Sequence, residues 1–502
     1  EPSSGHGVTT IVTGNCGVGF APVRPGTEAW LIQLMEGVED IPGTALAEGM
    51  TWDWETFPEY LDVLARRRFA IDVGSQVAHG AVRAYVMGER GAKNEPATPE
   101  DIAAMAEIVR EAIAAGAFGF STSRTLGHRA MDGEPVPGTF AAEDELFGLG
   151  RAVRDGGGGV FELAPAGAAG EDIVAPHKEV AWMKRLAAET GIPVSFALLQ
   201  VDAAPRLYEE LMDESLDALN EGVRLVPQVA ARPFGILIGF GTNHPFAGRP
   251  TYRRLASTLS PDELARALTE PEHRAAILAE QDVPGTRGGL GGTVLHALER
   301  VFILGDPPDY EPTPERSIAS MARASGEDPA AVLYDRMSER DGRGLLMLPF
   351  FSYSDGNHEA IREMLTHPAG VSGLGDGGAH CGVICDASMP TYLLTHWARD
   401  RARGPRLELE WVVRKQTKDT AELYGFSDRG TITLGKRADL NIIDFDRLRL
   451  DQPEVVYDLP AGGRRLIQHA AGYTATIVGG AITRRDGADT GARPGRLVRR
   501  GG

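Results

Sequence analysis

Cysteine is scarce in this chain, with three residues (Cys16, Cys381 and Cys385) among 502. Three cysteines are too few for a disulfide scaffold and are typical of a reducing compartment, so we expect a soluble, cytoplasmic protein. Long apolar runs are also missing, since no window approaches the roughly 18 consecutive apolar residues that a membrane span requires. The sequence therefore predicts no membrane association.

Basic residues are fewer than acidic ones, 51 against 70, and the formal net charge is −19. Such a balance argues against a polyanionic partner, either nucleic acid or an anionic membrane surface. No Gly-x-Gly-x-x-Gly motif follows an early strand, which disfavours a dinucleotide-binding fold. The expected partner is thus a small molecule, and the sequence is compatible with a homo-oligomer.

Short β-branched or apolar runs alternate with longer amphipathic stretches, and this alternation is typical of βα units around a parallel sheet. Helices are expected over 60–68 and over 99–115, the second with Thr98 as its N-cap and Pro99 at its first position. The expected strands, in chain order, are Thr9–Thr13, Ile71–Val77, Gly116–Ser121, Gly159–Leu163, Pro193–Leu199, Arg224–Val229 and Val371–Gly375.

Seven strands are one short of a (β/α)8 barrel, and the missing strand would precede Glu1. Because Glu1-Pro2-Ser3-Ser4 has the character of a connecting loop, we expect an N-terminally truncated fragment, with a mature terminus made by processing as the alternative. The predicted fold class is α/β, a TIM-like barrel with its first strand missing. An open doubly wound sheet is the structural rival.

The residue pattern changes near the C-terminus, where the segments 430–444 and 473–483 are typical of strands joined by turns. We expect the barrel over residues 1–421 and the C-terminal part of a small β-sandwich domain over 422–485. The Gly- and Arg-rich tail 486–502 has no apolar periodicity, so it either wraps the surface or is loose.

Polar side chains follow several of the expected strands, where the chemistry of a barrel is found. Cys16 follows the first strand between glycines, His79 the second, and Asp376 the last, while Arg124 closes the polar edge of the third. Each has a plain structural interpretation: a buried thiol, a satisfied histidine, a turn aspartate and a surface ion pair. Their convergence on one face of a barrel favours a metal or substrate site.

Longer motifs resemble the N-acyl-D-amino-acid deacylase (D-aminoacylase) family of the amidohydrolase superfamily. The segment from Gly7-Val8-Thr9-Thr10 to Gly14-Asn15-Cys16-Gly17 is the most specific match, and the likeness spans nearly the whole chain. Further matches are Ala115-Gly116-Ala117-Phe118-Gly119-Phe120-Ser121-Thr122, Gly375-Asp376-Gly377 and Gly435-Lys436-Arg437-Ala438-Asp439-Leu440-Asn441.

The resemblance implies zinc, with Cys16 as a ligand and Asp376 as a ligand or general acid/base. It also implies a His-x-His strand upstream of Glu1. Two departures concern the fifth and sixth strands of the complete barrel, where Ala164 and Leu198 stand in place of the family's ligand histidines. Either the metal is lost, or replacement ligands come from Glu162, Gln200, His380 and Cys381.

The resemblance implies metal-dependent hydrolysis of a linear, non-peptide amide, most simply an N-acyl-D-amino acid. Arg124, or Arg129 beside it, could hold a substrate carboxylate, and His79 could polarise the carbonyl. Two alternatives stay open at this point: a non-catalytic ligand-binding barrel, and a hydrolase of another C–N bond such as a cyclic amide.

Overall fold

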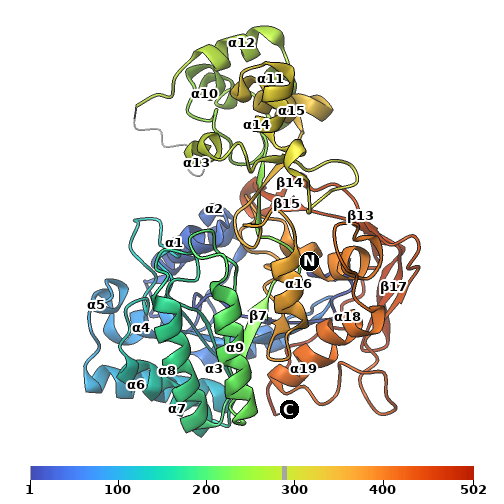
Figure 1. Cartoon of the computed structure of the whole chain (residues 1–502). Coiled ribbons are helices and arrows are strands. Elements are labelled where there is room, and N and C mark those ends of the chain that lie inside the picture. The colour runs from blue at the N-terminus through green and yellow to red at the C-terminus, as the bar shows by residue number, and fades with distance from the viewer. Residues whose placement is uncertain (1, 285–290, 502) are drawn as a thin grey trace.

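A curved parallel sheet forms the centre of the molecule (Figure 1). The structure, a computed structural model, describes residues 2–284 and 291–501. The strands of this sheet are β1 (Thr10–Thr13), β2 (Asp72–Ser75), β3 (Val77–Ala78), β4 (Gly119–Ser123), β5 (Val160–Ala164), β6 (Val194–Ala197), β7 (Leu225–Val229) and β11 (Val371–Ser372).

The strands follow one another around the sheet in chain order, all parallel, as in a TIM barrel. β2 pairs with β1, and β3, which continues the same strand, pairs with β4. The remaining order is β4-β5-β6-β7-β11. Within the described residues, the outer edges of β1 and β11 pair with no other strand, so the sheet is open between them. All seven predicted strand positions are confirmed.

Amphipathic helices cover the outside of this sheet and bury their apolar faces against it, which forms the main hydrophobic core. None of the described helices combines the length and the apolar character that a membrane crossing needs. The covering helices are α3 (Phe57–Arg66), α4 (His79–Met87), α5 (Glu89–Ala92), α6 (Pro99–Ala114), α7 (Glu143–Asp155), α8 (Ala175–Thr190), α9 (Leu207–Asn220), α16 (Glu359–Thr366), α18 (Leu409–Gln416) and α19 (Lys418–Tyr424).

The predicted start of α6 is confirmed in detail. Thr98 Oγ1 accepts a hydrogen bond from the Asp101 amide at 3.2 Å, the Asp101 carboxylate accepts one from the Thr98 amide at 2.9 Å, and Pro99 begins the helix. We expect Thr98→Ala to lower the free energy of unfolding by about 1 kcal/mol, because the Asp101 amide loses its acceptor and only one half of the reciprocal cap remains. Chemical denaturation measures this loss. The control is Thr433→Ala at an exposed position, for which we expect almost no change in the free energy of unfolding. Equal losses for the two variants would contradict the capping argument.

A helical insertion between β7 and β11 stands apart from the barrel in Figure 1, and the sequence patterns did not predict it. Its helices pack on a hydrophobic core of their own. Its elements are β8 (Gly235–Ile238), α10 (Pro250–Ala256), α11 (Pro261–Leu268), α12 (Pro271–Ala279), α13 (Gly291–His296), β9 (Phe302–Ile303), η2 (Pro314–Arg316), α14 (Ile318–Ser325), α15 (Pro329–Gly342) and β10 (Leu346–Pro349).

The C-terminal region is a small β module, as expected, and the N-terminal η1 (Ser3–His6) packs against it through the Tyr473 hydroxyl, which donates to the His6 carbonyl. The boundaries at residues 421 and 485 stay a prediction. The strands of the module are β12 (Leu440–Ile443), β13 (Arg449–Leu450), β14 (Glu454–Leu459), β15 (Gly463–Ile467), β16 (Ala470–Ala471), β17 (Tyr473–Val478), β18 (Ala481–Arg485) and β19 (Ala488–Asp489).

The tail after β19 is not loose. Its backbone runs alongside β2, where the Val73 amide donates to the Arg496 carbonyl at 3.0 Å and the Val498 amide donates to the Val73 carbonyl at 2.8 Å. Leu497 is buried in the main core. Low apolar periodicity failed to indicate this docking because the tail is held mainly by backbone hydrogen bonds, which any residue can make.

Candidate active site

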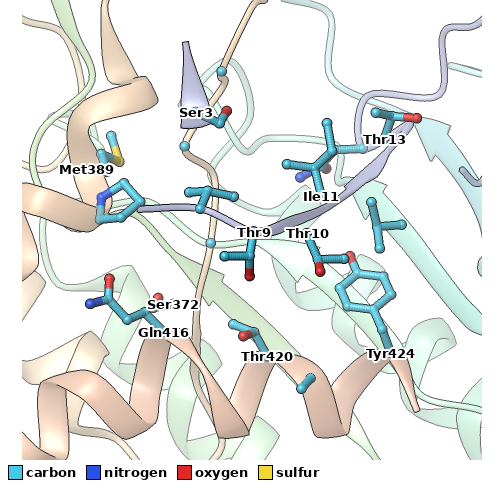
Figure 2. A pocket seen from close by; sticks show the side chains of 18 of the residues that line it. Ser3, Thr9, Thr10, Ile11, Thr13, Ser372, Met389, Gln416, Thr420 and Tyr424 are labelled. Atoms are coloured by element: carbon cyan, nitrogen blue, oxygen red, sulfur yellow. The ribbon is translucent and has the colours of Figure 1, made fainter. Parts of the chain in front are cut away.

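A cavity of about 1450 Å³ opens where the barrel strands end and extends along the free edge of β1. Figure 2 shows Thr9 and Thr10 pointing across it toward Thr420 and Tyr424 of α19. The cavity is lined at the barrel mouth by Cys16, Glu39, Glu162, Gln228 and Asp376.

Four side chains from distant segments gather at this mouth, and we call Cys16, Glu39, Asp376 and His380 the barrel-mouth cluster. Glu39 is the last residue of α1 (Glu28–Glu39), which together with α2 (Gly43–Gly49) forms an excursion after β1. Its carboxylate accepts a hydrogen bond from the Cys16 thiol and lies 3.5 Å from His380 Nε2. Cys16 and Asp376 keep partial exposure, which leaves them accessible from the cavity.

Burial and like charge dominate the electrostatics of the cluster. Burial, with the Glu39 and Asp376 carboxylates nearby, raises the pKa of the Cys16 thiol well above its usual range. Burial also raises the pKa of Glu39, against the opposing effect of His380. The pKa of Asp376 is raised to about 6, first by burial and then by Glu39, again against His380. A bound cation would relieve this crowding of acidic groups.

The loop that carries Asp376 is conformationally unusual. Leu374 has φ 59° and His380 has φ 48°, the left-handed region that side chains with a Cβ disfavour. Such strain persists only where the surrounding structure enforces it, and it concentrates at functional sites. Asp376 precedes the Gly377-Gly378 pair and His380 follows it, and the loop brings both side chains into the barrel-mouth cluster.

Glu162 occupies the barrel interior below the cluster. Its buried carboxylate accepts hydrogen bonds from the Tyr424 hydroxyl at 2.7 Å and from the side-chain amides of Gln76 and Gln228. Asn15, next to Cys16, donates to the Gln228 side-chain oxygen at 3.2 Å. Because the Glu162 oxygens are already well occupied, we interpret this network as support for the floor of the cavity.

His79 and Arg124 do not line this cavity. His79 is fully buried between the Thr122 hydroxyl and Glu145, at 2.8 and 2.9 Å. Arg124 pairs with Glu179 at 2.9 Å and donates to the Ala141 carbonyl. Both side chains are held by protein partners away from the cavity, so their predicted substrate-binding roles stay predictions without a contact to support them.

Among the four suggested replacement ligands, two lie at the cavity and two do not. His380 belongs to the barrel-mouth cluster and Glu162 lines the cavity. Gln200 instead donates to Asp355 at 2.8 Å, and the Cys381 thiol donates to the Asp40 carbonyl at 3.3 Å. Ala164 and Leu198 are buried apolar residues, so β5 and β6 end without a ligand at these positions.

The residue that sequence reasoning missed is Glu39. It ends α1, which lies at the barrel mouth, where Met35, Glu39 and Ile41 line the cavity. The sequence carries one signal, the acidic pair Glu39-Asp40 at the end of an amphipathic helix. Only the fold shows that this helix end meets Cys16.

The donors of the barrel-mouth cluster fit a divalent metal in chemistry and in charge. A thiol, two carboxylates and an imidazole are the ligand types of zinc, and they are crowded here with little opposing charge. In the part of the chain that the structure describes, no three of them come within 4.8 Å of one another. Metal binding would therefore draw these side chains closer together.

Known proteins share this sequence and fold. The chain is 26% identical over 515 residues to a D-aminoacylase of Alcaligenes xylosoxydans xylosoxydans, covering 99% of this chain and 82% of that protein. It is 25% identical over 499 residues to an N-acyl-D-aspartate deacylase of the same organism, covering 99% of this chain and 80% of the relative.

Solved structures agree in fold. A D-aminoacylase crystal structure superposes with a TM-score of 0.60 at 21% identity, covering 99% of this chain and 84% of that one. An N-acyl-D-glutamate deacylase from Bordetella bronchiseptica, complexed with zinc and a phosphonate inhibitor, gives 0.59 at 20% identity, covering 99% and 85%. Because the amidohydrolase family model also matches residues 1–484, the chain belongs to the amidohydrolase family.

Proposed function

We propose that this chain hydrolyses the linear amide of an N-acyl-D-amino acid or a similar small N-acyl compound. The observation that carries the proposal is the barrel-mouth cluster, in which Cys16 and Asp376 face one cavity from opposite ends of the chain. Relatives named D-aminoacylase and N-acyl-D-aspartate deacylase, aligned over 99% of the chain, support this substrate class.

The proposed metal is zinc, held by Cys16 and Asp376, with Glu39 and His380 close enough to contribute. When bound, such an ion polarises a substrate carbonyl and lowers the pKa of water to about 7. The solved relative with zinc and a phosphonate inhibitor supports this choice.

Asp376 is the proposed proton carrier. Its carboxylate accepts a proton from the attacking water, the new C–O bond forms as the C–N bond breaks, and the proton passes to the leaving nitrogen. Without a cation the pKa of Asp376 is raised to about 6, and a bound cation would lower it, so the ionised form that accepts the proton predominates at neutral pH.

A second candidate is a ligand-binding barrel without catalysis. The observation that favours it is the pair of apolar strand ends, Ala164 and Leu198, in place of metal donors. Metal held at the barrel-mouth cluster, measured as the zinc that depends on Cys16, separates the two candidates, because the binding barrel needs no ion there.

We expect the purified protein to bind zinc and Cys16→Ala to lose about one ion per chain, since the thiolate is the softest donor at the mouth. Inductively coupled plasma mass spectrometry reports the metal, and release of free amino acid from N-acyl-D-amino acids reports hydrolysis. The matched control is Cys385→Ala, another buried cysteine, which should retain both. A well-folded wild-type protein with no affinity for zinc and no hydrolysis would favour the binding barrel.

A further inference from the structure

A second group of metal donors lies outside the catalytic cavity, and we call Glu311, His358 and His396 the Glu311 cluster. Their donor atoms all lie within 4.8 Å of one another, the only such group of three in the part of the chain that the structure describes. None of the three lines the cavity at the barrel mouth. We propose that the Glu311 cluster is a structural binding site for a divalent transition metal such as zinc.

The hydrogen bonds of His358 prepare one of its nitrogens for a metal. His358 Nε2 lies 2.9 Å from the Tyr310 carbonyl oxygen, which can only accept, so Nε2 carries the proton. The lone pair of the neutral ring is then on Nδ1, which lies 3.8 Å from Glu311 Oε2 and accepts only a long hydrogen bond of 3.4 Å from the Tyr392 hydroxyl, which a metal would displace. A histidine that donates its far nitrogen to a backbone carbonyl is the usual arrangement around metal ligands.

His396 offers the second nitrogen. Its Nε2 lies 3.1 Å from Glu311 Oε2, yet it makes no hydrogen bond of acceptable geometry. The ring stacks on Tyr392, with centroids 4.5 Å apart and planes at 10°, which fixes its orientation. His396 lies on η4 (Leu393–Asp400), a π-helix; π-helical turns are rare and frequently occur at functional sites. A buried nitrogen without a hydrogen bond calls for a partner such as an ion.

Glu311 supplies the charge, and its nearest cation does not satisfy it. Glu311 Oε1 accepts the His358 amide at 2.8 Å, which holds the carboxylate in place. Arg401 lies 3.3 and 3.4 Å from the two oxygens, whereas it makes a shorter bond of 2.8 Å to Glu359. The charge of Arg401 is thus shared with a second carboxylate, and Glu311 Oε2 faces the two imidazoles.

A metal bound by the Glu311 cluster would join three segments that lie far apart in the sequence. Glu311 lies within the helical insertion between β9 and η2, His358 precedes α16, and His396 follows α17 (Met389–Tyr392). Glu311 and His358 are buried, while His396 retains a 16% exposed side chain through which an ion could enter. Two imidazoles and one carboxylate suit zinc, with water in the remaining position. The ion would tie the insertion to the barrel.

The test uses the full chain in a Cys16→Ala/Asp376→Ala background, which removes the proposed catalytic ligands. After chelation and dialysis, we expect added zinc to bind at about one ion per chain and to raise the Tm by about 3 °C. His358→Gln and His396→Gln should each abolish binding and the rise in Tm. His244→Gln, a buried histidine with no carboxylate beside it, should change neither.

X-ray absorption of zinc in this background keeps the proposal testable if the histidine variants fail to fold. A first shell of nitrogen and oxygen at about 2.0–2.1 Å, with imidazole scattering and no sulfur near 2.3 Å, is the expected spectrum. Absence of zinc binding, or a zinc shell without imidazole, would overturn the proposal and leave the cluster as a hydrogen-bonded ion pair. Because the readouts are binding and Tm, failure of the proposed hydrolase would not affect them.

Discussion

Asp376→Asn is expected to lower the rate of N-acyl-D-amino acid hydrolysis by about 10²- to 10⁴-fold, the usual contribution of a positioned general acid/base. Asparagine keeps the shape of the side chain but can neither take a proton from water nor return it to the leaving nitrogen. The effect should fall on kcat, because the proton moves only during the chemical step.

Two comparisons separate this effect from general damage. Asp155→Asn changes an exposed carboxylate that pairs with Arg154 far from the cavity, and we expect full activity. The Tm of Asp376→Asn should stay close to that of the wild type, since the residue is held in a loop rather than in the core. Activity within a few-fold of the wild type in a properly folded Asp376→Asn protein would remove Asp376 from the mechanism.

Arg83→Met is expected to lower the free energy of unfolding by about 3–5 kcal/mol, because it leaves a buried carboxylate without its cation. Arg83 Nη1 lies 2.6 and 2.7 Å from the two oxygens of Glu145, whose other partner is His79 Nε2 at 2.9 Å. The side chains of all three are at most 2% exposed. Burial lowers the pKa of His79, which disfavours its protonated ring as a replacement for the lost charge.

The free energy of unfolding of Arg83→Met should be compared with that of Arg151→Met, which breaks an exposed ion pair with Glu189. The side chains of Arg151 and Glu189 are 48% and 39% exposed, so we expect Arg151→Met to lower the free energy of unfolding by only about 0–1 kcal/mol. Arg83→Met/Glu145→Gln should recover part of the loss, because the neutral amide no longer needs a cation. Similar losses for the two single variants would show that water reaches Glu145.

The barrel strands were predictable because each is specified by its own residues. Short apolar runs such as Val160–Ala164 and Leu225–Val229 are bounded by glycine or polar residues, and strands buried on both faces need little else. The last strand is shorter than predicted, since pairing ends at Ser372 and the glycine-rich loop toward Asp376 begins. The insertion after β7 escaped prediction because its short helices lack the alternation with strands that marks a βα unit.

The sequence by itself determined the order of the strands, the cap of α6, the likeness to the deacylases, and Cys16 and Asp376 as the residues to examine. Those features depend on neighbours along the chain. Only the tertiary structure decided that Glu39 and His380 join them, that His79 and Arg124 face other protein groups, and that Glu311, His358 and His396 converge. These contacts join residues tens to hundreds of positions apart, and chain closure over such distances leaves no local pattern to read.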